Sequence, residues 1–236
     1  MSEALIRAAG VSKTFGDVRA LDDVSFHVDR GEVVVLLGRN GAGKSTLLRI
    51  LGTRVLPDAG EVHIDGIDGR RQPRDVRRRT GVVLPDERSW YWALTGRANL
   101  EFFARLSELP RRAARRRTAE VLEVVELTEG ADRRVAGYSS GMRARLSLAR
   151  ALLLSPPVLL MDEPARALDP AISRDLRRAV VALARETGCA VLWVTHDLHE
   201  AAVVADRVLL LEEGRLVHDA SGPSTAEALA RLMGVS

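Results

Sequence analysis

The sequence predicts an α/β fold with a mostly parallel sheet at its core. Three short apolar runs have the composition of strands that are buried on both faces, and they lie at residues 32–37, 158–161 and 190–194. Apolar residues with helical spacing follow the first two runs. Parallel strands need a long crossover, which is usually a helix, so this alternation favours a parallel sheet.

The segment between the first run and its helix is rich in glycine. Gly38-Arg39-Asn40-Gly41-Ala42-Gly43-Lys44-Ser45-Thr46 fits G-x-x-x-x-G-K-[ST], the phosphate-binding P-loop. Glycines let the backbone approach a phosphate closely, and successive N–H groups at a helix start form an anion-binding nest. We expect Lys44 to reach the β- and γ-phosphates and Ser45 to offer its hydroxyl to Mg²⁺. A glycine-rich turn that binds nothing is the alternative, and the lysine and hydroxyl in register argue against it.

Composition limits the class of protein. The chain has 236 residues, of which 46% are hydrophobic and 28% charged, so we expect a globular protein rather than a disordered one. No apolar run approaches the roughly 20 residues that a membrane-spanning helix needs, and the first residues predict no secretory signal. The single cysteine, Cys189, excludes an intrachain disulfide framework and a thiol-only metal site. A cytosolic chain is the simplest prediction.

The charge distribution offers a second, weaker signal. The net charge is +3, and arginines cluster at residues 70–79 and 111–117. Such clusters bind nucleic acid or anionic membranes in some proteins. Here no aromatic residues are interleaved with the arginines, so we favour a solvated face and expect no specific nucleic-acid partner.

Outside the three buried runs, further strands are predicted near both ends of the chain. Residues 5–8, 24–28 and 60–66 have strand patterns bounded by turns, and residues 208–211 and 216–218 flank a turn as a hairpin. Phe15 lies beside a glycine in one of these turns. It either anchors the turn or offers its ring to a nucleotide base.

Residues 89–155 have a helical pattern instead. The predicted apolar face includes Val121, Leu122, Val124, Val125 and Leu127. The polar turn Tyr138-Ser139-Ser140-Gly141-Met142 then leads into another helix, which either serine can cap.

Polar residues stand where the buried strands end. Asp162 and Glu163 follow residues 158–161, His196 follows residues 190–194, and Asp86 follows a shorter strand at residues 81–85. Ligands of open α/β sheets bind at the carboxyl ends of the strands. We therefore expect Asp162 to hold Mg²⁺ and Glu163 to position or deprotonate water. A lone histidine is more often structural, but this one shares the sheet edge with both carboxylates.

These motifs, in this order and spacing, resemble the ATP-binding subunit of an ABC transporter over essentially the whole chain. Residues 38–46 and 158–163 are similar to the Walker A and Walker B motifs, and residues 138–142 are similar to a signature turn that most P-loop proteins lack. The remaining matches are Ala167-Leu168-Asp169 with the D-loop, His196 with the switch histidine, and Phe15 with the aromatic residue that stacks on adenine.

The resemblance implies a P-loop NTPase fold with a mostly parallel core sheet, an N-terminal antiparallel β subdomain and a helical subdomain that carries the signature turn. It implies ATP and Mg²⁺ bound between two subunits placed head to tail. The implied roles are Glu163 as general base, His196 on the γ-phosphate, and Ser45, Asp162 and Asp86 around Mg²⁺. Ser139 and Gly141 are implied to close over the γ-phosphate held by the other subunit, and Asp169 of the D-loop is implied to belong to the same nucleotide-binding set. We expect the β subdomain and P-loop core at about 1–85, the helical subdomain at about 86–155, the rest of the core at about 156–220 and a tail at about 221–236.

The chain departs from the family pattern at two places. The signature usually reads Leu-Ser-Gly-Gly-Gln, so Tyr138, Ser140 and Met142 differ here, while Ser139 and Gly141 are kept. Asp86 stands where a glutamine normally reaches Mg²⁺ and the attacking water, and its shorter side chain reaches less far. Both departures look like the exporter branch, whose membrane subunit is a separate polypeptide.

The resemblance implies a second ATP-binding subunit, identical or different, and a separate transmembrane permease that holds the chain at the cytoplasmic face of the membrane. An importer is the main alternative. A soluble ABC protein of ribosomes or DNA usually has two cassettes or a coiled-coil insert, and a P-loop kinase lacks the signature turn.

Trp90, Tyr91 and Trp92 cannot all face one core, so we expect at least one to be exposed and to line a groove for a helix of the permease.

Overall fold

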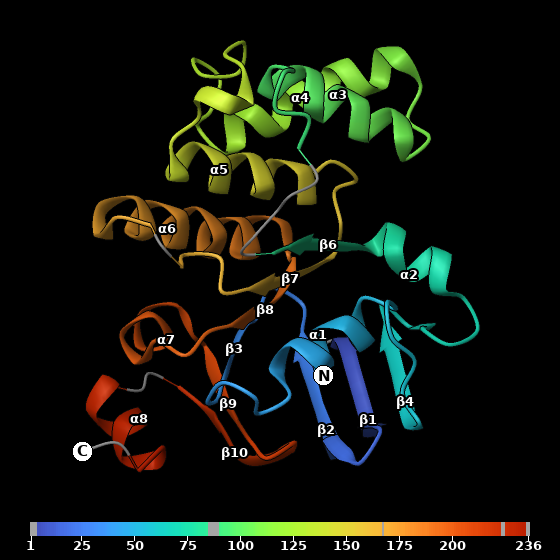
Figure 1. Cartoon of the computed structure of the whole chain (residues 1–236), viewed down its shortest axis with the longest axis vertical. Coiled ribbons are helices and arrows are strands. Elements are labelled where there is room, and N and C mark those ends of the chain that lie inside the picture. Colours follow the sequence, from blue (N-terminus) through green and yellow to red (C-terminus); the bar gives the residue numbers. More distant parts are fainter. Residues whose placement is uncertain (1–3, 85–89, 167, 223–224, 235–236) are drawn as a thin grey trace.

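The computed structural model describes residues 4–84, 90–166, 168–222 and 225–234 (Figure 1). The strands are β1 (Ala4–Phe15), β2 (Val18–Asp29), β3 (Val33–Leu37), β4 (Ala59–Ile64), β5 (Ile67–Asp68), β6 (Thr80–Val83), β7 (Val158–Asp162), β8 (Ala190–Val194), β9 (Arg207–Glu212) and β10 (Arg215–Ser221). The helices are α1 (Lys44–Leu51), α2 (Pro73–Arg79), α3 (Gly96–Leu106), α4 (Arg111–Val124), α5 (Ser140–Ala151), α6 (Pro170–Thr187), α7 (Leu198–Val204) and α8 (Ala226–Leu232), with a 3-10 turn at Val135–Gly137.

The core is a mostly parallel sheet, as predicted. Its six strands have the order β10-β9-β3-β8-β7-β6, and only β10 runs antiparallel to its neighbour. All five residues of β3 and all five of β8 are buried, which explains why their sequences are continuously apolar. Val34 and Leu36 pack in one apolar cluster, while Val33, Val35 and Leu37 pack in the other, because successive side chains point to opposite faces.

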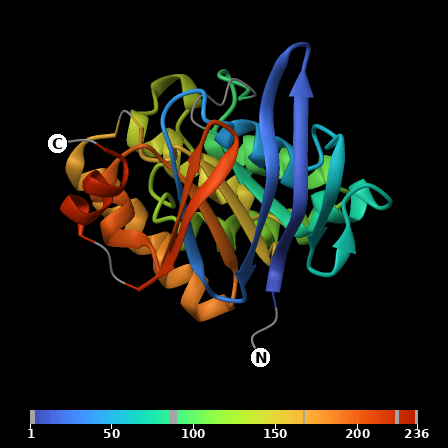
Figure 2. The ribbon, with the colours of Figure 1, turned by 90° about the horizontal axis from the view of Figure 1, so that it is seen from below.

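A second, antiparallel sheet is formed by the N-terminal strands in the order β2-β1-β4-β5. Phe15 pairs with Val18 at the tip of the β1–β2 hairpin, so the turn predicted beside Phe15 is confirmed. Figure 2 shows this hairpin beside the β9–β10 hairpin. The side chains of both sheets and of α1 share one apolar cluster, which fixes the P-loop between them.

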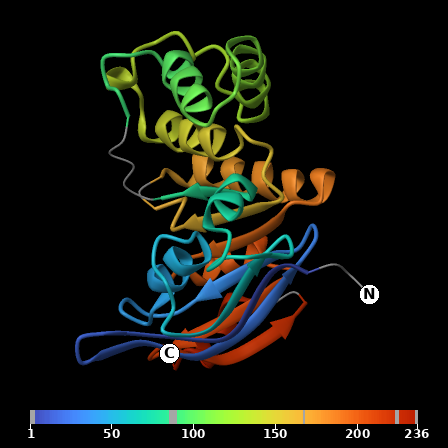
Figure 3. The same ribbon diagram turned by 90° about the vertical axis from the view of Figure 1, so that its right-hand side faces the viewer.

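Helices α3, α4 and α5 gather at one end of the molecule, and α6 lies between them and the strands (Figures 1 and 3). The predicted apolar face of α4 is correct at Val121 and Leu122, and it continues past the helix end through Val125 and Leu127, all of which are buried. It is wrong at Val124, whose side chain is 48% exposed, because a rotation of about 100° per residue carries this position outside the buried arc. The subdomain boundaries near residues 85, 155 and 220 stay a prediction.

The strand predicted at residues 81–85 is present as β6 (Thr80–Val83). Strand β6 pairs in parallel with β7 through Thr80–Val158 to Val83–Met161, and helix α8 occupies the C-terminal segment. Among the described helices, none combines the length and the apolar character needed to cross a bilayer.

Candidate nucleotide site

The P-loop joins the buried strand β3 to helix α1. Gly41 and Gly43 have φ values of 86° and 106°, which is the left-handed region that side chains with a Cβ rarely adopt. A Cβ at Gly43 would also collide with the Ala20 carbonyl of β2. The loop therefore requires glycine at these positions, and it leads directly into the N-terminus of α1, where backbone N–H groups favour anions.

Lys44, the first residue of α1, is only 6% exposed. Its Nζ donates hydrogen bonds to the carbonyls of Gly38, at 2.6 Å, and Arg39, at 3.0 Å, so the ammonium spans the loop. Burial lowers the pKa of Lys44, and the nearby carboxylates of Glu163 and Asp162 act in the opposite direction. A buried cation between loop carbonyls and two acids is positioned to meet phosphate oxygens.

The predicted metal ligands on β7 and α1 converge. Ser45 Oγ donates to Asp162 Oδ2 at 3.1 Å, across 117 residues of chain. Burial raises the pKa of Asp162, and the neighbouring Glu163 charge raises it further. The Ser45 hydroxyl and the Asp162 carboxylate are hard oxygen donors, and the negative charge of Glu163 lies beside them, so this group of atoms fits Mg²⁺. No group of three or more possible ligands is found among the described residues.

The predicted catalytic pair also meets. Glu163 Oε1 lies 2.9 Å from His196 Nδ1, and these residues follow the neighbouring strands β7 and β8. Glu163 Oε2 is buried without a hydrogen-bond partner, and Arg166 Nη1 lies 3.5 Å from it. The Glu163 backbone has a φ of 46°, a conformation that costs about 1–3 kcal/mol and is frequent at functional sites. His196 is 54% exposed, so it stands at the open side of the pair.

Phe15 is exposed at the hairpin tip, and a lysine supports it. Lys13 Nζ lies 5.3 Å from the centre of the Phe15 ring and 2.7 Å from Asp58 Oδ1. Asp58 Oδ2 also accepts from the Thr14 N–H at 2.8 Å. The hydrogen bond with Lys13 lowers the pKa of Asp58. The sequence analysis missed this support, although Lys13 and Phe15 are two residues apart on a strand and therefore share a face.

The signature turn lies at the start of α5. Ser139 caps this helix by accepting a hydrogen bond from the Met142 N–H at 3.2 Å, so of the two candidate serines Ser139 is the cap. A Cβ at Gly141 would lie 2.8 Å from Ile172 of α6, so the turn packs on the helix that Asp169 begins. The Asp169 side chain is exposed and makes no capping hydrogen bond.

The signature turn does not meet the P-loop of its own chain. Figures 1 and 3 place α5 on the far side of α6 from α1, with strands β6 and β7 between them and α1. Two other predicted residues, Asp86 and Ala167, lie outside the described part of the chain. The structure thus brings together Lys44, Ser45, Asp162, Glu163 and His196, and it leaves the signature turn with Ser139 and Gly141 at the start of α5, beyond α6. Asp169 lies at the start of α6.

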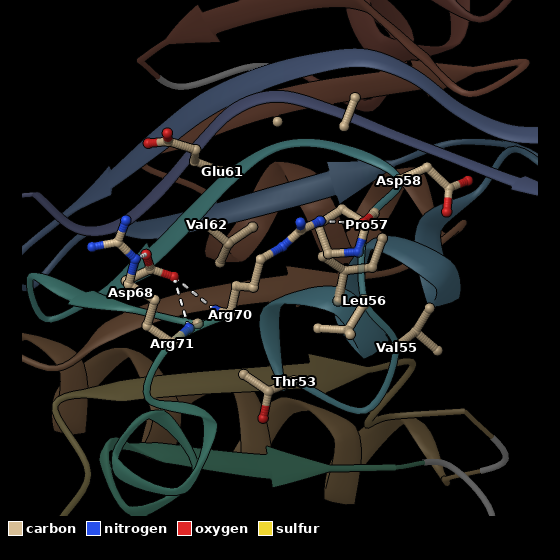
Figure 4. A pocket seen from close by; sticks show the side chains of 14 residues that line it. Thr53, Val55, Leu56, Pro57, Asp58, Glu61, Val62, Asp68, Arg70 and Arg71 are labelled. Carbon is tan, nitrogen blue, oxygen red and sulfur yellow. Dashed lines mark hydrogen bonds and ion pairs between the residues drawn. The ribbon is translucent and has the colours of Figure 1, made fainter.

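One cavity borders the predicted Mg²⁺ ligands, and a second cavity lies away from them. One, of about 260 Å³, adjoins Ser45 and Asp162 and reaches Leu84 at the end of β6. The other, of about 240 Å³, lies against β4 and contains none of the predicted site residues (Figure 4). Its arginine side chains have local partners, since Arg70 Nη2 donates to the Pro57 carbonyl at 2.8 Å and Arg71 Nε lies 3.4 Å from Asp68 Oδ2.

The chain resembles known proteins over most of its length. A family model described as ABC transporter matches residues 21–166. The daunorubicin resistance ATP-binding protein DrrA2 of Streptomyces coeruleorubidus is 43% identical, with 97% of this chain and 69% of the relative covered. The sulfate/thiosulfate import ATP-binding protein CysA of Bordetella parapertussis is 42% identical, with 89% of this chain and 60% of the relative covered. This chain thus spans about two thirds of the length of these relatives.

Solved structures agree with the sequence relatives. The dimeric post-hydrolysis state of the ATP-binding cassette MJ0796, bound to ADP and Pi, has a TM-score of 0.81 at 29% identity and covers 92% of this chain and 98% of its own. The cbiO1 protein of Clostridium perfringens, part of the ABC transporter complex cbiONQ, has a TM-score of 0.85 at 26% identity and covers 93% and 89%. The chain therefore belongs to the ABC transporter family, and it is an ATP-binding, ATP-hydrolysing subunit of that family.

Proposed function

We propose that this chain hydrolyses ATP with Mg²⁺ in a site that two copies complete, and that it drives export through a separate membrane subunit. One observation carries the two-copy site. The P-loop, Asp162, Glu163 and His196 form one half of a site, while helix α5, which begins at the signature turn, lies on the other side of α6. A head-to-tail dimer would place the Ser139 and Gly141 of one copy over the phosphates held by the other.

The chemistry follows from the half-site that each chain forms. The P-loop N–H groups and Lys44 bind the β- and γ-phosphates. Ser45 and Asp162 would hold Mg²⁺, which neutralises charge on the phosphates when bound. Glu163 accepts a proton from a water molecule while the water oxygen bonds to the γ-phosphorus. The bond between the γ-phosphorus and the oxygen that bridges it to ADP breaks, and ADP leaves with that oxygen. The products are ADP and inorganic phosphate.

His196 and the second copy complete the proposed site. His196 orients Glu163 through the 2.9 Å contact and offers its exposed ring to the γ-phosphate. Ser139 and Gly141 of the second copy contact the same phosphate, with Asp169 at the seam. Phe15 stacks on the adenine, and Asp86, which lies outside the described residues, is the remaining residue proposed to contact Mg²⁺. Hydrolysis removes the phosphate that both copies contact, so ATP stabilises the closed dimer and ADP does not.

We place the chain at the inner face of the membrane, bound to a permease. The name of DrrA2, a drug-resistance protein, supports export. The name of CysA, an import protein, supports the alternative that this chain serves an importer. A tagged chain purified from detergent-solubilised membranes of its own host should carry a transmembrane subunit with it. Inside-out vesicles that contain this complex should accumulate daunorubicin when ATP is added outside. Recovery of a complex with an extracellular solute-binding protein, and uptake that needs that protein, would replace export by import.

The permease-binding surface is proposed from the exposed aromatics. Trp90 is buried, whereas Tyr91 and Trp92 are 49% and 46% exposed, as the prediction of at least one exposed aromatic required. Tyr91 packs edge to face on Phe102, with ring centres 4.8 Å apart, so the Tyr91 ring of the proposed permease-binding surface is already held in place. Exposed aromatics on a rigid support are favoured anchors at interfaces.

Alanine at Tyr91 or Trp92 should weaken binding of the permease by about tenfold or more. ATPase activity and thermal stability of the isolated chain should remain, because both rings are half exposed. The measurement is the yield of permease that co-purifies with each variant. Val203→Ala, another exposed apolar side chain on α7, is the matched control. Unchanged co-purification for both variants would remove this surface from the interface.

A further inference from the structure

Tyr138 replaces the usual leucine at the first position of the signature turn, and its ring is buried at 4% exposure. Its hydroxyl donates a hydrogen bond to the Gly130 carbonyl at 2.8 Å. Its own carbonyl accepts from Arg143 Nη1 at 2.6 Å. The residue directly before Ser139 is thus fixed at both its side chain and its backbone.

Gly96 lies against this ring. A Cβ at Gly96 would overlap the Tyr138 hydroxyl oxygen and lie 3.0 Å from Cζ. Gly96 is the first residue of α3, and its φ is not among the positive values in the described chain. Glycine disfavours a helix relative to alanine. The backbone conformation gives no reason for a glycine here, whereas the Tyr138 ring does.

The two residues belong to segments that are joined along their length. The Arg97 N–H donates to the Ala131 carbonyl at 2.9 Å, and the Val135 N–H donates to the Leu94 carbonyl at 3.0 Å. The Ala136 N–H then donates to the Trp92 carbonyl at 3.1 Å. The segment that leads from the exposed aromatics into α3 is therefore hydrogen-bonded to the segment that leads into the signature turn.

We infer that Tyr138 and Gly96 form a matched pair that positions the signature turn, so that Ser139 and Gly141 meet the phosphate held by a second copy. Tyr138 is a positioning residue, because it acts through the turn and does not itself face the ligand. The inference rests on the proposed two-copy site. Through the hydrogen bonds to residues 92–97, it also ties the turn to the surface that carries Tyr91 and Trp92.

The test measures ATP-dependent dimerisation in the Glu163→Gln background, where hydrolysis does not dissolve the dimer. Gly96→Ala should weaken this dimerisation by at least about fivefold, because the ring must move and carry the turn with it. ATP binding by the single chain should not change, since the P-loop lies on the other side of α6. Gly137→Ala is the matched control, because a Cβ there meets nothing within 4 Å and its φ is not positive.

The second residue of the pair supplies the rescue. Tyr138→Leu in the Gly96→Ala chain removes both clashing atoms and should restore at least half of the lost dimerisation, and Tyr138→Phe should restore less because Cζ remains. The pairing would be overturned if Gly96→Ala left ATP-dependent dimerisation unchanged. It would also be overturned if Gly96→Ala weakened dimerisation and neither Tyr138→Leu nor Tyr138→Phe restored it. If Gly96→Ala does not fold, Tyr138→Phe alone decides. A loss of about threefold in dimerisation with unchanged ATP binding supports the inference, and no loss overturns it.

These results also separate the inference from the proposed function. If the Glu163→Gln chain binds ATP but stays monomeric with Gly96 and Tyr138 intact, the two-copy site fails, and this inference fails with it. If that chain dimerises and the Gly96 and Tyr138 variants behave like the Gly137→Ala control, only the inference fails.

Discussion

Glutamine in place of Glu163 is expected to lower the rate of ATP hydrolysis by about 10²–10⁴-fold while ATP binding is retained. The amide keeps the size of the carboxylate but cannot accept the proton of the attacking water. Glu163 Oε1 lies 2.9 Å from His196 Nδ1, and Glu163 Oε2 has no hydrogen-bond partner among the described residues, although Arg166 Nη1 lies 3.5 Å from it. Phosphate release under saturating ATP measures the rate, and titration with a fluorescent ATP analogue measures binding.

A matched surface variant is the control for this prediction. Glu186→Gln, at an exposed position near the end of α6, makes the same chemical change away from the site and should hydrolyse ATP normally. Equal turnover for the Glu163→Gln chain and the unmodified chain would show that Glu163 is not the base.

Lys44→Ala should weaken ATP binding by about 10–100-fold, which is the effect expected for the loss of one or two charge-assisted hydrogen bonds. The ammonium is buried and already held at the P-loop carbonyls, so little ordering is needed when phosphate oxygens arrive. Isothermal titration with ATP and Mg²⁺ measures the change. The Arg105→Ala variant removes an exposed cation in the last turn of α3 and should bind ATP normally. Unaltered affinity after Lys44→Ala would place the phosphates elsewhere.

The strands and the half-site could be predicted because local pattern and chemistry coincide there. The run before Gly38 is continuously apolar, since β3 is buried on both faces, and the P-loop glycines are required by left-handed turns and by close contact with Ala20. Asp162 ends β7, Glu163 comes directly after it, and His196 comes after the neighbouring parallel strand β8, so their meeting at one edge follows from the topology.

The rest depends on contacts that no local pattern specifies. The exposure of Val124 depends on where α4 packs, because its type alone would suit a core. The Lys13–Asp58 pair joins residues 45 positions apart, and the Tyr138–Gly96 contact joins the turn before α5 to the first residue of α3. Which of the three consecutive aromatics faces inward was equally undetermined, because Trp90 is chosen by its packing on Phe103, with ring centres 5.7 Å apart.

The two-copy site is tested most directly by the mass of the Glu163→Gln chain in solution, measured by light scattering with and without ATP and Mg²⁺. The account predicts a monomer without nucleotide and with ADP, and a dimer with ATP. Adding Lys44→Ala to this chain should abolish the dimer, because the phosphates that bridge the copies are no longer held. A chain that binds ATP in this assay, alone or with its permease, and remains a strict monomer would contradict the account.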